Sequence, residues 1–329
     1  MREYAFELAV CAALEAESDG IIARQLGTES RIVDVVEISP GPEFEARAEI
    51  TPETIPGPAI ESEIGVGRAR RPAAAIDTSP ERAEAIAERA VEIGFFEAER
   101  RNGRRYVRQA ARYPEWIGKI RAIENKPDLG RPGDLERQLR KDVSLALFDE
   151  VELVTASYVT GAHLNRIPDA VGVRRFDPET GRSETIREPT RLPSEETGIS
   201  IVEDHPSRTD IEPVSADRKA RLRRRVAERA YGKGWRPETL PSCERAAAKG
   251  PPFGREDGLP YCGWKERFVD PASECGPTGC PEYAPAEPPE SDTNAIRAKR
   301  TPWRADPDGV TRRQAGLDAF GEGESGDGG

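Results

Sequence analysis

The spacing of apolar residues along the chain predicts helices and strands in alternation. Tyr4, Leu8 and Cys11 recur every three to four residues, which is the period of an amphipathic helix over residues 2–17. Short runs rich in β-branched residues predict strands at residues 31–38, 117–126, 151–159, 170–176, 183–187 and 198–202. Further helices are expected at residues 81–93, 134–148 and 216–229. The order of these elements indicates an α/β fold.

Residues 40–116 differ from the rest because an irregular, proline-rich stretch opens them. Ser79 can cap a helix that Pro80 is suited to begin. After that helix, Asn102 and Gly103 separate two strand-like runs, and Asn-Gly is a strong hairpin signal. A helix followed by an arginine-rich hairpin resembles the recognition helix and wing of a winged-helix module. The segment is therefore either a DNA-binding subdomain or, as in many helix–hairpin pairs, only a packing unit.

Composition adds an unusual charge balance to this pattern. Charged residues make up 33% of the chain, the formal net charge is -11, and only eight of the 49 basic residues are lysine. This balance, with few aromatic residues, suggests a halophilic protein adapted to high salt, which screens surface charge over a few ångströms. The net charge consequently does not exclude a DNA partner, because a local arginine cluster matters more than the sum.

The sequence predicts neither a membrane protein nor a secreted one. No apolar run is long enough to span a membrane. Acidic residues at Glu3, Glu7, Glu15 and Glu17 do not fit a secretory signal. We therefore expect a cytoplasmic protein, and in that reducing compartment its five cysteines favour metal ligation over disulfides.

The candidate chemistry lies on two of the predicted strands. In residues 117–126, Ala122, Glu124 and Lys126 share one strand face, so the strand ends with a carboxylate and an amine side by side. Asp34 lies among valine and isoleucine in the strand at 31–38, where an unpartnered carboxylate is costly. If the two strands are neighbours, Asp34 and Glu124 can bind one Mg²⁺ or Mn²⁺. Lys126 would then position a water or stabilise developing charge.

This succession of elements resembles the PD-(D/E)XK nuclease superfamily, whose core is a restriction-endonuclease-like mixed sheet flanked by helices. Asp34 stands for its first acid, and Glu124-Asn125-Lys126 supplies its E-x-K. Gln138-Leu139 opens a helix similar to the Q-L-x-x-Y-x-x-A-L helix of RecB-like and Cas4-like members. The resemblance implies a nuclease fold in which Asp34, Glu124, Lys126 and Gln138 belong to the active site.

The resemblance also implies an acid on the first helix, which is Glu7, with Glu15 as the alternative. The chain departs from the pattern at Asp142, where those members carry tyrosine. It departs again in the ninety residues between Asp34 and Glu124, which require an insertion. The chain as a whole also resembles an uncharacterised haloarchaeal protein family.

Four cysteines cluster late in the chain in a segment rich in glycine and proline, and these are Cys243, Cys262, Cys275 and Cys280. Such a segment has too few apolar residues to order itself, so a metal is a natural stabiliser. Four thiolates suit structural Zn²⁺ or an iron–sulfur cluster, although the tight C-x₂-C spacing of most zinc sites is absent. Some Cas4-like nucleases carry such a cluster, but with one cysteine ahead of the core. Zinc, a cluster and no metal therefore all remain open, while Cys11 is expected in the core.

The resulting division assigns residues 1–39 and 117–205 to the nuclease-like core and residues 40–116 to an inserted winged-helix-like subdomain. Residues 206–284 hold a basic helix and the four-cysteine segment, and residues 285–329 form a disordered acidic tail. His163 and His205 are isolated and are expected in loops.

The sequence leaves two functions open. The first is a metal-dependent phosphodiesterase that cleaves DNA in repair or defence, and such nucleases are often homodimers. The second is a non-catalytic DNA-binding or interaction protein on a degenerate nuclease fold.

Overall fold

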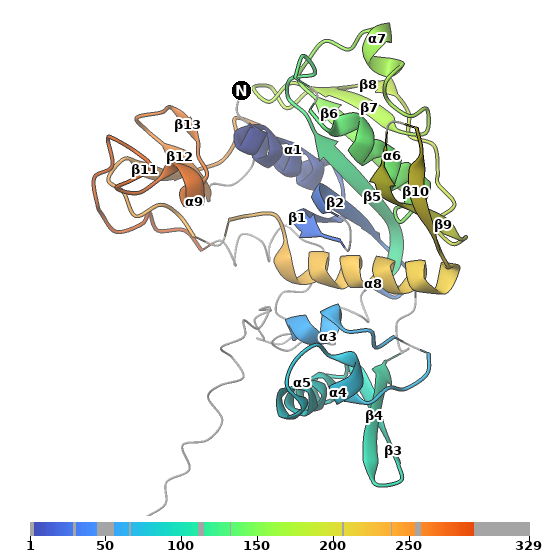
Figure 1. Cartoon of the computed structure of the whole chain (residues 1–329). Helices are drawn as coiled ribbons and strands as arrows, with labels where there is room; N and C mark the ends of the chain where they lie inside the picture. The colour runs from blue at the N-terminus through green and yellow to red at the C-terminus, as the bar shows by residue number, and fades with distance from the viewer. Residues whose placement is uncertain are drawn as a thin grey trace, which may run out of the picture. The chain divides into compact units, whose positions relative to one another are not determined.

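The computed structural model describes residues 3–28, 31–44, 56–65, 67–110, 115–131, 133–205, 207–237, 239–253 and 258–292 (Figure 1). The chain divides into two compact units. The first draws on Met1–Ser39, Lys119–Arg223 and Gly234–Pro302, and the second on Pro40–Gly118 and Arg224–Lys233. The expected insertion at 40–116 thus corresponds to the larger part of the second unit, which also takes in one end of the basic helix.

A six-stranded mixed sheet with the order β1-β2-β5-β6-β7-β8 is the centre of the first unit. Its strands are β1 (Ile21–Gly27), β2 (Ile32–Pro40), β5 (Ile117–Asn125), β6 (Glu150–Thr155), β7 (Gly172–Phe176) and β8 (Ser183–Arg187). β5, β6 and β7 run parallel, while β1 and β8 are antiparallel to their neighbours. The α/β class with a mixed sheet flanked by helices is therefore confirmed.

The first helix, α1 (Glu3–Glu17), packs against this sheet, and all its residues from Phe6 to Leu14 are buried. Its core includes Val35 of β2, Ile123 of β5 and Val154 of β6. Because side chains alternate along a strand, Asp34 and Glu124 project towards the other face. The helix α6 (Leu135–Leu145) follows β5 and is amphipathic, with Leu135 and Leu139 buried.

The second unit contains the helix and hairpin expected from the sequence. α5 (Pro80–Glu92) is capped by the Ser79 side chain, which accepts a hydrogen bond from the Arg82 backbone. β3 (Phe96–Arg101) and β4 (Arg104–Gln109) form the hairpin, and Asn102 and Gly103 both have positive φ, as the two-residue turn requires. The shorter helices α3 (Gly57–Glu61) and α4 (Pro72–Ala75) contribute Ile60 and Ala75 to one apolar core with α5 and the hairpin.

The later part of the chain adds smaller elements, several of which the sequence pattern did not predict. They are α7 (Gly161–Leu164), β9 (Gly198–Asp204), β10 (Thr209–Val214), α8 (Ala216–Lys233), β11 (Ala246–Lys249), β12 (Leu259–Cys262), β13 (Arg267–Phe268) and α9 (Pro271–Glu274). β9 and β10 form a hairpin where only one strand was expected, and β11, β12 and β13 form a small sheet. Most of the expected disordered tail, residues 293–329, lies outside the described residues.

No helix among the described residues is long and apolar enough to cross a membrane.

Candidate active site

Asp34 and Glu124 lie on adjacent strands, as the sequence required for a shared site, since β2 and β5 are neighbours in the sheet. Asp34 is half-buried in a strand whose residues 35–38 are all buried. Its Oδ2 accepts a hydrogen bond of 2.9 Å from the backbone N–H of Asn125, next to Glu124. The pKa of Asp34 is raised, chiefly by burial, although the Asn125 N–H and the Arg31 charge oppose the rise. β5 ends at Asn125, one residue before Lys126.

Glu124 is the more strongly perturbed of the two acids. It is buried, and its pKa is raised to about 8, first by burial and next by the negative charge of Asp34, against the opposing effect of Arg31. The charge of Asp34 thus destabilises the ionised form of Glu124. A site where two ionised carboxylates must share a buried position is one that a cation would stabilise.

Glu7 of α1 lies close enough to Asp34 for the charge of Asp34 to act on it. Arg24 donates to Glu7 Oε1 at 2.8 Å and Gln25 donates to Glu7 Oε2 at 2.6 Å, so both oxygens are held. Its pKa is raised to about 7 by burial, with the charge of Asp34 adding to the rise and Arg24 opposing it. A hydrogen bond from Gln25 also acts on Asp34 and lowers its pKa. Gln25 therefore connects the helix acid to the strand acid.

The position of Gln25 depends on its backbone. Gln25 has a φ of 52°, in the left-handed region that L-residues seldom adopt. It lies in β1, between Arg24 and Leu26, which pair with Val35 and Val33 of β2. The strand at residues 21–27 was absent from the sequence prediction, so neither Gln25 nor Arg24 was identified as a site residue.

Arg31 joins Glu124 to α6. Its Nη1 donates to Glu124 Oε2 at 2.9 Å, and its Nε donates to Asp142 Oδ1 at 3.0 Å, while Nη2 also bonds Asp142. The three side chains are buried, with exposed fractions of 10%, 7% and 8% for Arg31, Glu124 and Asp142. Asp142 is the position where the helix departs from the tyrosine of the resembling nucleases. Here it anchors the guanidinium that orients Glu124.

The charges of this group leave room for a divalent cation. Four buried or half-buried carboxyl groups, Glu7, Asp34, Glu124 and Asp142, face two guanidinium groups, Arg24 and Arg31. When all six groups are ionised, their net charge is -2. The oxygen donors are of the kind that Mg²⁺ and Mn²⁺ prefer, so the residues present fit such an ion. The described carboxylates of Glu7, Asp34 and Glu124 are not all within 4.8 Å of one another. Asp34 and Glu124 are the candidate ligands because their strands are adjacent.

The other predicted site residues are Lys126, Gln138 and Glu15, which have separate contacts. Lys126 follows β5, donates its backbone N–H to Val154 and places its Nζ 3.3 Å from Glu3 Oε1. Gln138 is half-buried on α6, and no hydrogen bond from its amide is found among the described residues. Glu15 pairs with Arg236 at 2.7 Å and accepts from the Trp235 indole, which is a structural role.

The raised pKa values predict how stability varies with pH. Glu124 titrates at about 8 and Glu7 at about 7 when folded, against 4.5 as their ordinary value. The folded state therefore binds more protons than the unfolded state between these limits, and the free energy of unfolding must fall as pH rises through the window. We expect the melting temperature of the chelator-treated protein to fall from pH 5 to pH 8, and to fall less steeply in Glu124→Gln. A flat profile in both proteins would contradict the raised pKa values.

The four late cysteines lie around the small β11–β12–β13 sheet, and all are free thiols of intermediate exposure. Cys262 ends β12, Cys275 directly follows α9, and Cys243 forms an isolated bridge with Pro285. Cys11 is fully buried on α1, as expected of a core residue.

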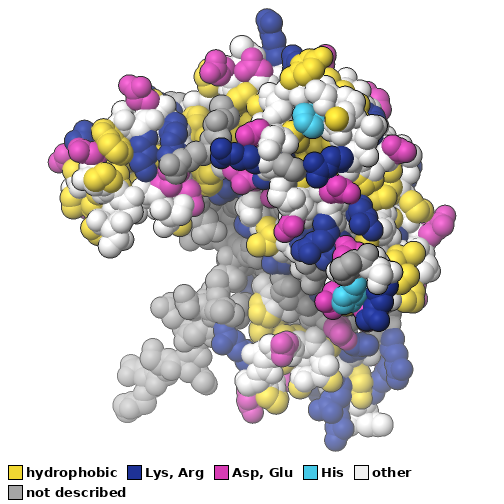
Figure 2. Space-filling model, turned by 45° about the horizontal axis from the view of Figure 1, so that its top comes forward, with side chains coloured by type: hydrophobic (Ala, Val, Ile, Leu, Met, Phe, Trp, Pro, Cys, Tyr) yellow, Lys and Arg dark blue, Asp and Glu magenta, His cyan; other side chains and the backbone are white. Residues whose placement is uncertain are grey.

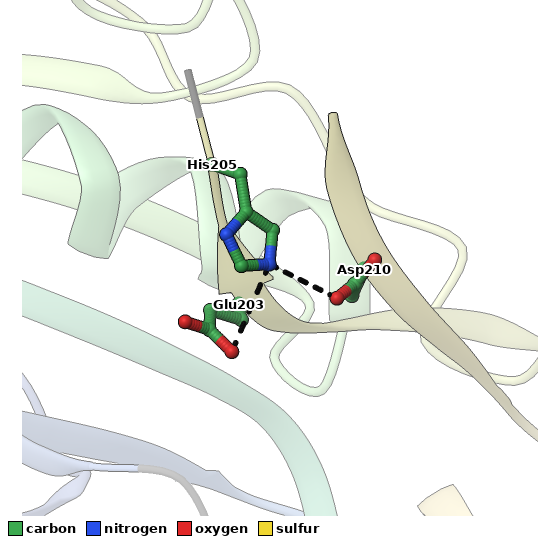
Figure 3. Close-up of side chains that lie close together, drawn as sticks. All are labelled: Glu203, His205 and Asp210. Carbon is green, nitrogen blue, oxygen red and sulfur yellow. Dashed lines mark hydrogen bonds and ion pairs between the residues drawn. The ribbon is translucent and has the colours of Figure 1, made fainter. Parts of the chain in front are cut away.

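The two histidines, drawn in cyan in Figure 2, each have other partners. His163 joins a capping box with Thr160 at the start of α7. His205 Nε2 lies 3.1 Å from Asp210 and 3.7 Å from Glu203 at the end of the β9–β10 hairpin (Figure 3). Among the described residues this is the one trio of potential ligand atoms within 4.8 Å of one another. Arg208 also pairs with Asp210 at 3.2 Å, so the trio is explained as a surface ion-pair cluster.

Comparison with known proteins gives a family but no activity. The model of a family of unknown function (DUF5787) matches residues 21–285, which include Asp34, Glu124 and all four late cysteines. No curated protein and no solved structure was found to match the chain.

Proposed function

We propose that this chain, which belongs to the DUF5787 family, is a divalent-metal-dependent nuclease with an active site of the PD-(D/E)XK type. The observation that carries the proposal is the acid pair on neighbouring strands, half-buried Asp34 and buried Glu124, in which the charge of Asp34 helps raise the pKa of Glu124. When ionised, these two acids, Glu7, Asp142 and the two arginines have a net charge of -2. A divalent metal ion that takes part in hydrolysis would neutralise this charge.

Each residue of the group has a distinct part in this proposal. Asp34 and Glu124 would hold Mg²⁺ or Mn²⁺, which activates water and stabilises the charge that develops on a phosphate. Arg31 orients Glu124 by holding one of its oxygens, and Asp142 fixes Arg31. Gln25 would hold Asp34 by a hydrogen bond while also donating to Glu7. Lys126, one residue beyond the end of β5, carries an amine that would exchange its contact with Glu3 for a substrate phosphate or the attacking water.

The β3–β4 hairpin is the part of the chain best suited to bind the DNA backbone. Arg100 pairs with Arg105 and Arg101 with Arg104 across the strands, and like charges directly opposite destabilise a hairpin. Lys and Arg side chains gather there at the bottom of Figure 2. Within the described residues, Arg101 pairs with Glu99 and Arg105 with Glu88, whereas Arg100 and Arg104 have no ion-pair partner. A polyanion would relieve this repulsion, which favours the winged-helix-like interpretation of residues 40–116.

Removing two of these arginines should change the salt dependence of DNA binding. In Arg100→Ala/Arg104→Ala, measured in chelator so that DNA stays intact, the slope of log K against log salt concentration should fall by about 2, because each phosphate contact contributes roughly 0.9. The matched control is Arg182→Ala/Arg191→Ala, which removes two exposed arginines of the other unit and should leave the slope unchanged. Equal slopes in all three proteins would exclude the hairpin from the DNA interface.

A substrate panel tests the nuclease itself. Purified protein in high salt is incubated with single-stranded, duplex and branched DNA, in Mn²⁺, Mg²⁺ or chelator, beside a Glu124→Gln variant. Metal-dependent cleavage by the wild type alone is the expected result. Cleavage that persists in Glu124→Gln would indicate a contaminating nuclease or a different active site.

A non-catalytic DNA-binding protein is the second candidate, and one observation favours it. The Arg31 guanidinium already pairs with Glu124 Oε2. Such a pair is expected in a degenerate site, where a side-chain cation has replaced the metal. DNA binding without cleavage under every metal condition would select this alternative. In either case five free thiols fit a protein of the reducing cytoplasm.

A further inference from the structure

We propose that Cys243, Cys262, Cys275 and Cys280 bind a structural zinc ion that orders the small β11–β12–β13 sheet. The first argument is the lack of apolar packing in this part of the chain. Among its described residues from 243 to 285, Leu259 and Val269 are the only buried aliphatic or aromatic side chains apart from two prolines, Pro251 and Pro260. Leu259 packs into the α1 core and not into a core of its own. A segment of this kind requires another source of stability, such as a metal.

Backbone pairing brings the four cysteines together from separate stretches. Cys262 pairs with Ala246, whose N–H donates to Cys243 at 2.9 Å. Cys243 forms a bridge with Pro285, which ties the first stretch to the last. Cys280 donates its N–H to Gly276 at 3.1 Å, so it turns back towards Cys275. Each cysteine thus lies at a turn or strand end whose backbone contacts connect it to a stretch that carries another of the four cysteines.

The electrostatics agree with this convergence. Burial raises the pKa of the Cys275 thiol, Lys265 opposes the rise, and Cys262, Cys243 and Cys280 all add to it, so these three thiols lie within electrostatic range of Cys275. The charges of Cys262 and Cys275 also help raise the pKa of Arg267.

Ligation requires the thiols to turn towards a common centre. No three of the described sulfur atoms lie within 4.8 Å of one another, so rotation about the Cα–Cβ bonds must close the set. Four thiolates satisfy tetrahedral zinc completely, with no redox chemistry to shield from water. The half-exposed thiols and their charged neighbours Lys265, Arg267 and Glu274 suit such an inert ion better than a cluster whose potential depends on solvent exposure.

Metal analysis of the full-length protein, purified without added metal, tests the proposal. The expected result is about one zinc per chain and no stoichiometric iron, with zinc lost in Cys262→Ser/Cys280→Ser. Cys11→Ala, which alters a core cysteine outside the segment, and Asp34→Asn should both keep zinc, so the result does not depend on the nuclease site. Stoichiometric iron with visible absorbance, or protein without metal, would overturn the zinc assignment.

A second measurement on the wild type covers the case in which the double variant does not fold. A mercurial reagent is titrated into the folded protein while a zinc indicator records release. Zinc should appear in proportion to the thiols modified and be complete when four have reacted. Zinc release that does not follow thiol modification would contradict cysteine ligation.

Discussion

Replacing Asp34 with asparagine is expected to abolish metal-dependent DNA cleavage and to raise the melting temperature of the metal-free protein. Loss of an outer-shell partner typically reduces activity 10–100-fold, so loss of a ligand should exceed roughly 100-fold. Stability should increase because Asp34 is desolvated and its charge raises the pKa of Glu7 and Glu124. Asparagine keeps an oxygen to accept the Asn125 N–H while removing that charge. Relief worth about 1 kcal/mol corresponds to roughly 2–4 °C.

Paired activity and melting measurements in chelator decide this prediction. Asp177→Asn is a suitable control because Asp177 is an exposed acid in a turn, where it accepts from Glu179 and Thr180. That variant should retain cleavage and gain no stability. A variant Asp34→Asn that melts lower than the wild type, yet cleaves normally, would show that Asp34 is only a structural acceptor.

Replacing Arg31 with alanine is expected to be the most destabilising single change at the site. Arg31 is buried between Glu124 and Asp142, and its loss leaves two buried carboxyl groups without their cation. Breaking a buried pair in this way costs about 3–5 kcal/mol, and protonation of Glu124 would reduce the loss. Chemical denaturation of the metal-free protein measures the effect. The double variant Arg31→Met/Asp142→Leu, which removes both charges, should recover a large part of the lost stability.

The exposed pair Arg70 and Glu63 supplies the matched control. Their side chains are 49% and 71% exposed, so Arg70→Ala should cost less than about 1 kcal/mol. Equal losses of unfolding free energy in Arg31→Ala and Arg70→Ala would contradict the conclusion that Arg31 stabilises two buried carboxyl groups.

The acid pair was predictable because it depends on local pattern. An aspartate inside a β-branched run and a glutamate at the end of an alternating strand are visible in the sequence, and the strands that carry them are adjacent in the sheet. The Asn-Gly hairpin and the Ser79 cap were predictable for the same reason, since a few neighbouring residues determine each of them.

The supporting residues were not predictable because they act through long-range contacts. Arg31 meets Asp142 across 111 positions of sequence, and no local pattern distinguishes it from the many surface arginines. Gln25 lies next to Asp34 because β1 pairs with β2, and its backbone there is left-handed. The β11–β12–β13 sheet was missed because its strands are two to four residues long and lack apolar alternation.

Calorimetric titration of Mn²⁺ into chelator-treated protein in high salt tests the central claim most directly. The acid pair predicts binding of about one Mn²⁺ per chain that disappears in Asp34→Asn and in Glu124→Gln and persists in the exposed control Asp177→Asn. Absence of binding in the wild type, or binding that survives both substitutions, would contradict a metal site between β2 and β5.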